Sequence, residues 1–88
     1  MNVQALLELA EAFRQAHPKL AKHGFVLIFE DEVTGWKRRL LHPETELPGT
    51  YAVGVDSTIF QACGGDWMGG ARSYLQIYPK IDQEENEC

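Results

Sequence analysis

The first twenty residues constrain the fold most, because they hold the one clear helical repeat of hydrophobic residues in the chain. From Val3 to Leu20, apolar side chains recur at intervals of three and four residues, which places them on one face of an α-helix. Asn2 is a residue type that caps helix starts, and Pro18 disfavours helical backbone before it. We therefore expect an amphipathic helix that bends or stops at Pro18, with a further turn ending at Gly24.

Short runs of β-branched and aromatic residues, separated by turn residues, predict strands in the rest of the chain. These runs lie at 25–29, 36–41, 51–55, 58–63 and 72–78. The first run is apolar on both faces, which is typical of a strand inside a sheet. One helix followed by such strands predicts an α+β fold, in which the N-terminal helix packs on an antiparallel meander sheet of four to five strands.

The length and the distribution of charge predict one domain and a tail. A chain of 88 residues has room for a single hydrophobic core and no second domain. Four of the thirteen acidic residues fall within 82–88, which leaves nine acids against eight bases in residues 1–81. We therefore expect an almost neutral α+β domain over 1–81 and an acidic, disordered tail over 82–88.

The cysteines and the N-terminus suggest where the protein works. Two cysteines, Cys63 and Cys88, are too few for a disulfide framework, which favours a reducing compartment. The first residues lack the basic and apolar regions of a secretory signal, and no apolar run approaches membrane-spanning length. We expect a cytoplasmic protein that does not engage a membrane.

Residues that could carry catalysis are present without the spacing that catalysis requires. Cys63 stands before two glycines whose amides could face an oxyanion, but no histidine has a spacing that brings it to the thiol. The histidines and cysteines are also not paired at the separations typical of metal sites. We therefore predict no metal, no cofactor and no enzymatic activity, and we keep a small enzyme or enzyme subunit using Cys63 as an alternative.

A small basic cluster follows the first predicted strand. Lys37, Arg38 and Arg39 stand beside Trp36 and near His42, and cations and aromatic rings of this kind bind phosphates and bases. Because the acidic turn at 30–32 belongs to the same predicted hairpin, we expect cross-strand charge pairs instead. This expectation and the almost neutral body argue against nucleic acid as a partner.

The remaining candidate site is a loop in which glycine pairs flank three other residues. Gly64-Gly65 and Gly69-Gly70 enclose Asp66, Trp67 and Met68 between two predicted strands. Trp and Met are enriched at protein–protein interfaces. Trp36 and Tyr74 lie on predicted strands that could approach the loop. The loop is either a lid that closes the core or an interaction tip, and the second interpretation gives a predicted protein-binding site of Asp66, Trp67, Met68, Trp36 and Tyr74.

We therefore predict a small, non-catalytic protein-binding or regulatory module. It would act through the Trp-Met loop, an exposed sheet face containing Ile28, Leu41, Ile59 and Tyr74, or a sheet edge, and the partner is another protein or a second copy in a homodimer. A second hypothesis is an acidic inhibitor that mimics nucleic acid and binds a nucleic-acid-binding complex. It rests on the acidic tail together with Glu44, Glu46, Asp56 and Asp66.

Overall fold

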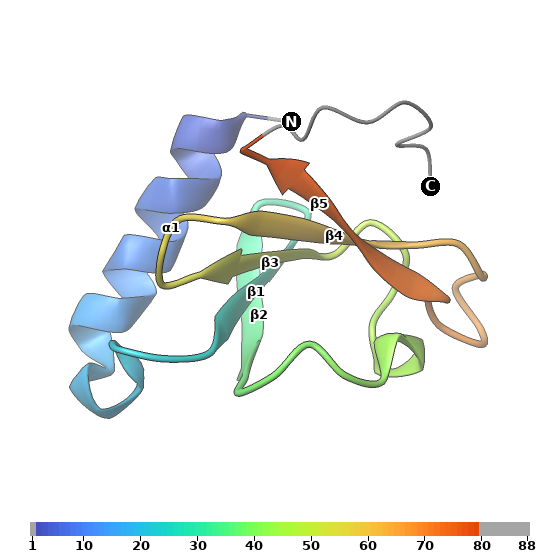
Figure 1. The fold of residues 1–88 in the computed structure, drawn as a ribbon, viewed down its shortest axis with the longest axis horizontal. Helices are drawn as coiled ribbons and strands as arrows, with labels where there is room; N and C mark the ends of the chain where they lie inside the picture. The colour runs from blue at the N-terminus through green and yellow to red at the C-terminus, as the bar shows by residue number, and fades with distance from the viewer. Residues whose placement is uncertain (1, 80–88) are drawn as a thin grey trace.

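The computed structural model describes residues 2–79 and shows one helix packed on a five-stranded antiparallel sheet (Figure 1). The predicted α+β class is therefore confirmed. The predicted acidic tail at 82–88 lies outside the described residues. The elements in chain order are α1 (Val3–Ala16), η1 (Pro18–Leu20), β1 (Phe25–Phe29), β2 (Glu32–Lys37), η2 (Pro43–Thr45), β3 (Tyr51–Gly54), β4 (Ile59–Cys63) and β5 (Ser73–Tyr78).

Helix α1 begins and ends where its sequence predicts. The Asn2 side chain accepts a hydrogen bond from the backbone N–H of Ala5 at 3.2 Å, which satisfies one of the free donors of the first turn. The helix stops at Ala16, two residues before Pro18, and the chain continues in the short 3-10 turn η1. The buried stripe is Leu6, Ala10 and Arg14, so the third member of the stripe is a charged residue.

Arg14 joins the helix to the sheet and to the turn that follows the helix. Its guanidinium donates to five backbone carbonyl oxygens at 2.9–3.3 Å. Arg14 is only 8% exposed. The acceptors are Leu20, Ala21, His23, Gly24 and Val53. Burial lowers the pKa of Arg14, and the charge of Glu11 partly opposes this shift. The five acceptors compensate the buried cation without a direct carboxylate partner.

The strand order in the sheet is β2-β1-β3-β4-β5, and every neighbouring pair is antiparallel. Strand β1 lies inside the sheet, as its apolar sequence predicts. The arrangement departs from a plain meander at one point, because β3 pairs with β1 and leaves β2 at the edge. The chain from β2 to β3 must therefore cross from one side of β1 to the other, and it does so through the segment that contains η2.

One face of the sheet packs against α1 and forms the main core. This core contains Val26, Ile28, Val53 and Ile59 from the sheet and Leu6 and Ala10 from the helix. Ile28 and Ile59 are 0% exposed. The prediction that these two isoleucines line an uncovered sheet face is therefore wrong, because they point toward the helix.

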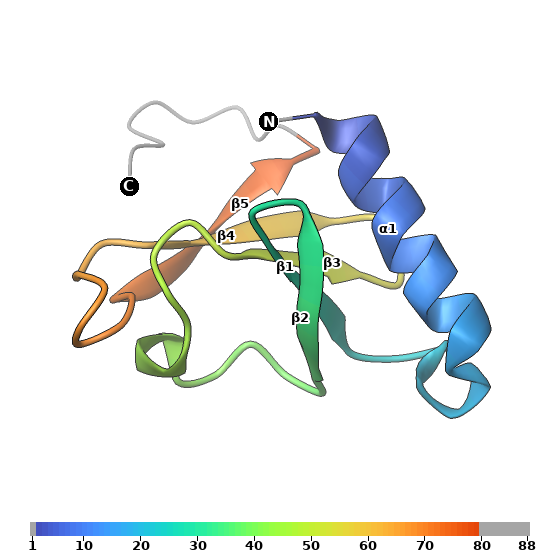
Figure 2. The same cartoon turned by 180° about the vertical axis from the view of Figure 1, so that it is seen from behind.

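The opposite face is closed by curvature of the sheet and by a contact between its two edges. A flat sheet would place the first and fifth strands about 19 Å apart, which two side chains cannot span. Yet Lys37 of β2 and Tyr74 of β5 are hydrogen-bonded at 2.9 Å between Nζ and the hydroxyl. Figure 2 shows β2 crossing β3 and β4 steeply, as a strongly twisted sheet requires. This closure leaves Leu27, Ala52 and Ala62 buried beneath it.

Replacing Arg14 should test how much the fold depends on this buried cation. We expect Arg14→Met to lower the free energy of unfolding by about 2–4 kcal/mol, because Val53 O and the carbonyls after α1 lose a charged donor. Urea denaturation followed by circular dichroism measures the change. Arg38→Met is the matched control, since Arg38 is exposed and its loss should change stability by less than about 0.5 kcal/mol. Equal effects of the two substitutions would contradict the role given to Arg14.

Candidate functional site

The loop between β4 and β5 depends on glycines because its two sides approach each other closely. Gly65 and Gly70 have φ angles of +72° and +87°, a region that residues with a side chain rarely occupy. A Cβ on Gly65 would overlap the carbonyl of Gly70, and a Cβ on Gly70 would overlap the backbone of Glu44. The glycine pairs thus permit a tight loop that lies directly against the segment containing η2.

Asp66 closes this loop through its backbone and its side chain. Asp66 and Gly70 exchange backbone hydrogen bonds of 3.2 and 2.8 Å. The Asp66 carboxylate oxygen Oδ1 also accepts from the backbone N–H groups of Met68 and Gly69, at 3.1 and 2.6 Å. The side chain therefore acts as a local turn-forming group. Of the predicted binding residues, Asp66 is the one that shapes the loop.

Two backbone hydrogen bonds fix the end of the loop to the rest of the domain. Ala71 N donates to Glu46 O at 2.8 Å, and Arg72 N donates to Cys63 O at 2.8 Å. The loop is therefore closed internally, anchored to the end of β4 and supported by the residue that follows η2. This support explains why the glycine-rich sequence forms a defined hairpin-like projection.

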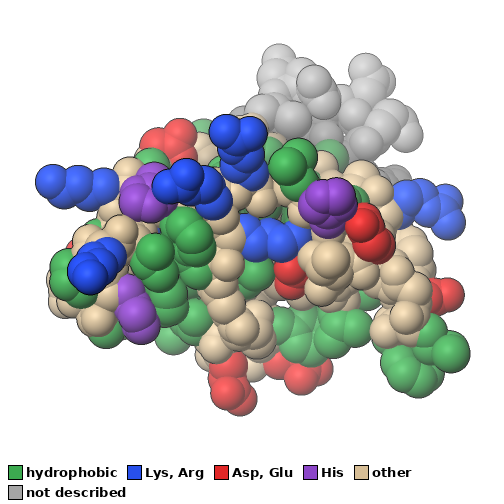
Figure 3. Space-filling model, turned by 90° about the horizontal axis from the view of Figure 1, so that it is seen from below, with side chains coloured by type: hydrophobic (Ala, Val, Ile, Leu, Met, Phe, Trp, Pro, Cys, Tyr) green, Lys and Arg blue, Asp and Glu red, His purple; other side chains and the backbone are tan. Residues whose placement is uncertain are grey.

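Trp67 and Met68 form the tip of the projection and lie outside the core. Trp67 is 76% exposed and Met68 is 79% exposed, the highest values among the large hydrophobic residues that the structure describes as exposed. Hydrophobic side chains stand out at the right-hand end of Figure 3, the end at which the β4–β5 loop lies in Figure 1. Of the two interpretations of this loop, the lid on the core is therefore excluded.

The other two predicted site residues have separate structural roles. Trp36 packs against the main core, and its indole N–H donates to His23 O at 3.2 Å. Tyr74 accepts a hydrogen bond from Lys37 on the face of the sheet opposite the helix. The structure thus brings Asp66, Trp67 and Met68 together in one loop, and it gives Trp36 and Tyr74 partners elsewhere.

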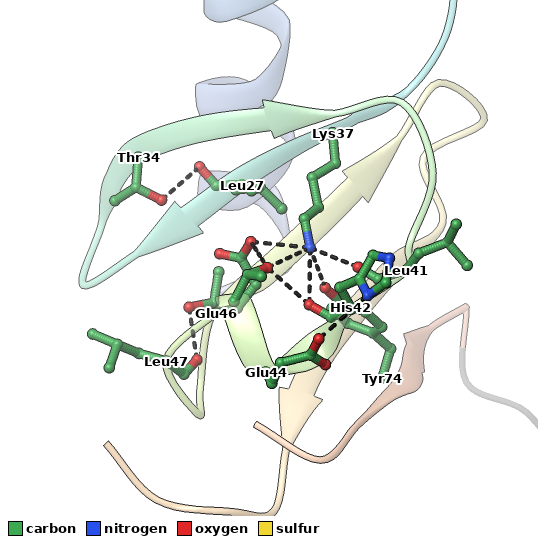
Figure 4. Close-up of polar contacts among 11 residues, drawn as sticks. Leu27, Thr34, Lys37, Leu41, His42, Glu44, Glu46, Leu47 and Tyr74 are labelled. Atoms are coloured by element: carbon green, nitrogen blue, oxygen red, sulfur yellow. Dashed lines mark hydrogen bonds and ion pairs between the residues drawn. The ribbon is translucent and has the colours of Figure 1, made fainter. Parts of the chain in front are cut away.

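Lys37 holds the segment that supports the tip (Figure 4). Its ammonium nitrogen lies 2.7–3.2 Å from five oxygen atoms, four in the crossing segment and one on the opposite edge strand β5. These are the carbonyl oxygens of Leu41 and His42, Thr45 Oγ1, Tyr74 OH and Glu46 Oε2. An ammonium has three protons, so five acceptors share them. Sequence reasoning missed this cluster because its members are far apart in the chain.

The surroundings of Lys37 favour its charged form. Burial lowers the pKa of Lys37, but hydrogen bonds with Tyr74 and Glu46 and their electrostatic attraction outweigh burial, so the pKa is raised above its ordinary value. The side chains of Lys37 and Glu46 are 19% and 14% exposed. An ion pair that is this shielded from water contributes more than an exposed pair.

The predicted cross-strand charge pairs between Lys37–Arg39 and the acidic turn are absent from the β1–β2 hairpin. The register places Lys37 opposite Phe25 and Glu32 opposite Phe29. The acidic turn therefore lies at one end of the hairpin and the basic residues lie at the other. The prediction was wrong because it placed the second strand at 36–41, whereas β2 begins at Glu32 directly after a tight turn and ends at Lys37.

The remaining candidates for chemistry do not assemble into a reactive cluster in the described part of the chain. Cys63 ends β4 and is buried, and residues 2–79 contain no free cysteine. The hypothesis of a Cys63 nucleophile therefore gains no support from the structure. Within the same residues, no three His, Cys, Asp or Glu side chains are grouped as metal ligands would be. No helix in this range is long and apolar enough to cross a membrane.

Comparisons with protein-family models, with curated proteins and with solved structures found no match to this chain. The functional argument therefore rests on the loop itself.

The two glycines next to each other at the end of the loop offer a matched pair of variants. We expect Gly70→Ala to lower the free energy of unfolding by about 3 kcal/mol, because of its positive φ and the overlap with Glu44. Gly69→Ala should cost less than about 1 kcal/mol, since its Cβ would meet only Asp66 Oδ1 at 3.3 Å. Thermal and urea unfolding measure both. Similar losses for the two variants would contradict the close approach of Gly70 to the backbone of Glu44.

Lys37 should contribute to stability in a way that depends on pH. Its pKa is higher in the folded protein than in the unfolded chain, so its contribution is complete below the unfolded value of about 10.4 and is lost as the pH rises through the folded value. We expect Lys37→Met to cost roughly 1–3 kcal/mol at neutral pH. The difference from the wild type should shrink above about pH 10.

Urea unfolding of both proteins between pH 7 and 11 measures this difference. Comparing the two proteins at each pH removes the contributions of groups that do not contact Lys37. A difference in unfolding free energy that stays constant across the whole range would contradict the proposed cluster.

Proposed function

We propose that this protein is a non-catalytic protein-binding module and that the Trp67–Met68 tip is its binding element. One observation carries the proposal: two large apolar side chains are more than three-quarters exposed at the end of a loop that is fixed by hydrogen bonds. When a partner covers these two side chains, their apolar surface is removed from water, and this burial stabilises the complex. Trp residues of this kind often dominate binding energy.

The support of the loop favours binding over a purely structural role. A loop that served only to connect β4 and β5 would not need Asp66 to close it or Glu46 to anchor it. A tip that is already held in one conformation loses little conformational entropy when a partner binds. The fixed geometry therefore increases the affinity that two side chains can provide.

Replacing both tip residues should separate binding from folding. We expect Trp67→Ser combined with Met68→Ser to leave the melting temperature almost unchanged, because neither side chain belongs to the core. The same variant should capture at least tenfold less partner protein than the wild type, as expected when a central aromatic anchor is removed. Quantitative mass spectrometry of proteins captured from the producing cells by the tagged chain measures this loss.

Leu41→Ser is the matched control, since Leu41 is also a large apolar residue and is 54% exposed outside the tip. It should leave capture unchanged. The proposal fails if the double variant captures the same proteins in the same amounts as the wild type. It also fails if the melting temperature of the double variant falls by many degrees, because the tip would then be part of the core.

A further inference from the structure

The shape of the tip restricts what can bind it. The tip is a convex projection, and an aromatic side chain buries about 150–250 Å² at most. Two tips packed against each other would therefore bury on the order of 700 Å² in total, below the roughly 1,200 Å² of a standard interface. A flat surface would bury still less of each side chain. A partner must surround the tip to gain enough area.

The surface next to the tip carries one cation without an ion pair. Arg72 is exposed at the end of the loop, and no carboxylate in residues 2–79 forms an ion pair with it. The acids nearby have other contacts: Asp66 accepts from backbone N–H groups, Glu46 pairs with Lys37, and Glu44 lies 3.2 Å from the His42 ring nitrogen Nδ1. Arg72 is therefore the cation beside the tip that remains available to pair with a carboxylate of a partner.

Arg72 also borders a hollow at the base of the tip. This hollow has a volume of about 260 Å³ and is lined by Gly65, Asp66, Gly69, Gly70, Ala71 and Arg72. Half of its lining residues are glycines, so a partner could approach the loop closely there. A side chain that entered the hollow would lie beside Arg72.

From these observations we propose that the partner is a protein with a concave apolar pocket that receives the Trp67 indole, and that an Asp or Glu at the rim of this pocket pairs with Arg72. The inference rests on the proposed function and adds the chemistry of the partner surface. The pocket provides the area that a flat contact lacks. The rim carboxylate complements the one unpaired cation beside the tip and accelerates correct association.

A photo-crosslinking residue at the tip tests the proposal in the producing cells. p-Benzoylphenylalanine replaces Met68, and in separate control proteins it replaces Leu41 or Val55, which are exposed elsewhere. We expect position 68 to give a discrete protein adduct that the controls do not give and that Trp67→Ser abolishes. Tandem mass spectrometry should place the adduct among apolar pocket residues within reach of an Asp or Glu.

Charge reversal then tests the rim carboxylate. Arg72→Glu should reduce the yield of the adduct three- to tenfold, Arg72→Lys should retain most of it, and raising the salt concentration should weaken it. Arg38→Glu is the matched control, because it changes the net charge equally at an exposed site away from the loop and should have no effect.

The outcomes distinguish this inference from the proposed function. An adduct that requires Trp67 but is indifferent to Arg72→Glu and to salt overturns the rim carboxylate and leaves the tip as a binding element. An adduct of twice the chain's mass identifies a second copy, and a lipid adduct identifies a membrane surface; either overturns the pocketed partner. Folded protein that gives no adduct at position 68 overturns both proposals.

Discussion

The closure of the sheet and the position of the crossing segment depend on the contacts of the Lys37 ammonium. This ammonium lies among oxygens from the crossing segment and from Tyr74 on the opposite edge strand, so it joins both edges of the sheet to the chain between them. Glu46, its ion-pair partner, also accepts the backbone hydrogen bond from Ala71 that anchors the β4–β5 loop. The position of the exposed tip is therefore linked, through Glu46, to one partly buried lysine.

Arg14 performs a comparable task on the other side of the sheet. Both cations donate to several backbone carbonyls that lie outside the strands, Arg14 to those after α1 and Lys37 to those in the crossing segment. A domain of this size buries a limited apolar area, so its irregular segments gain little from hydrophobic packing. A charged donor with several acceptors orders such segments through hydrogen bonds that are stronger than neutral ones.

The sequence predicts local structure well because local structure depends on neighbouring residues. The helix, its Asn2 cap and its end before Pro18 follow from short-range rules, and so does the interior position of β1. The pairing of β3 with β1 and the contact of Lys37 with Tyr74 depend on residues far apart in the chain. For Trp67, the sequence is compatible with both a lid and a tip, and the 76% exposure of its side chain in the folded domain decides between them.

The separation of these roles has a functional consequence. Trp67 and Met68 are exposed and contribute little to the core, so the tip can change in sequence without loss of the fold, whereas replacing Lys37 should destabilise the domain. In the proposed binding module, the residues that would contact a partner are thus distinct from the residues that hold the loop, and a preorganised site built in this way remains adjustable. The tip is held by a cluster that is itself shielded from water, so its geometry should persist over the neutral pH range in which Lys37 stays charged.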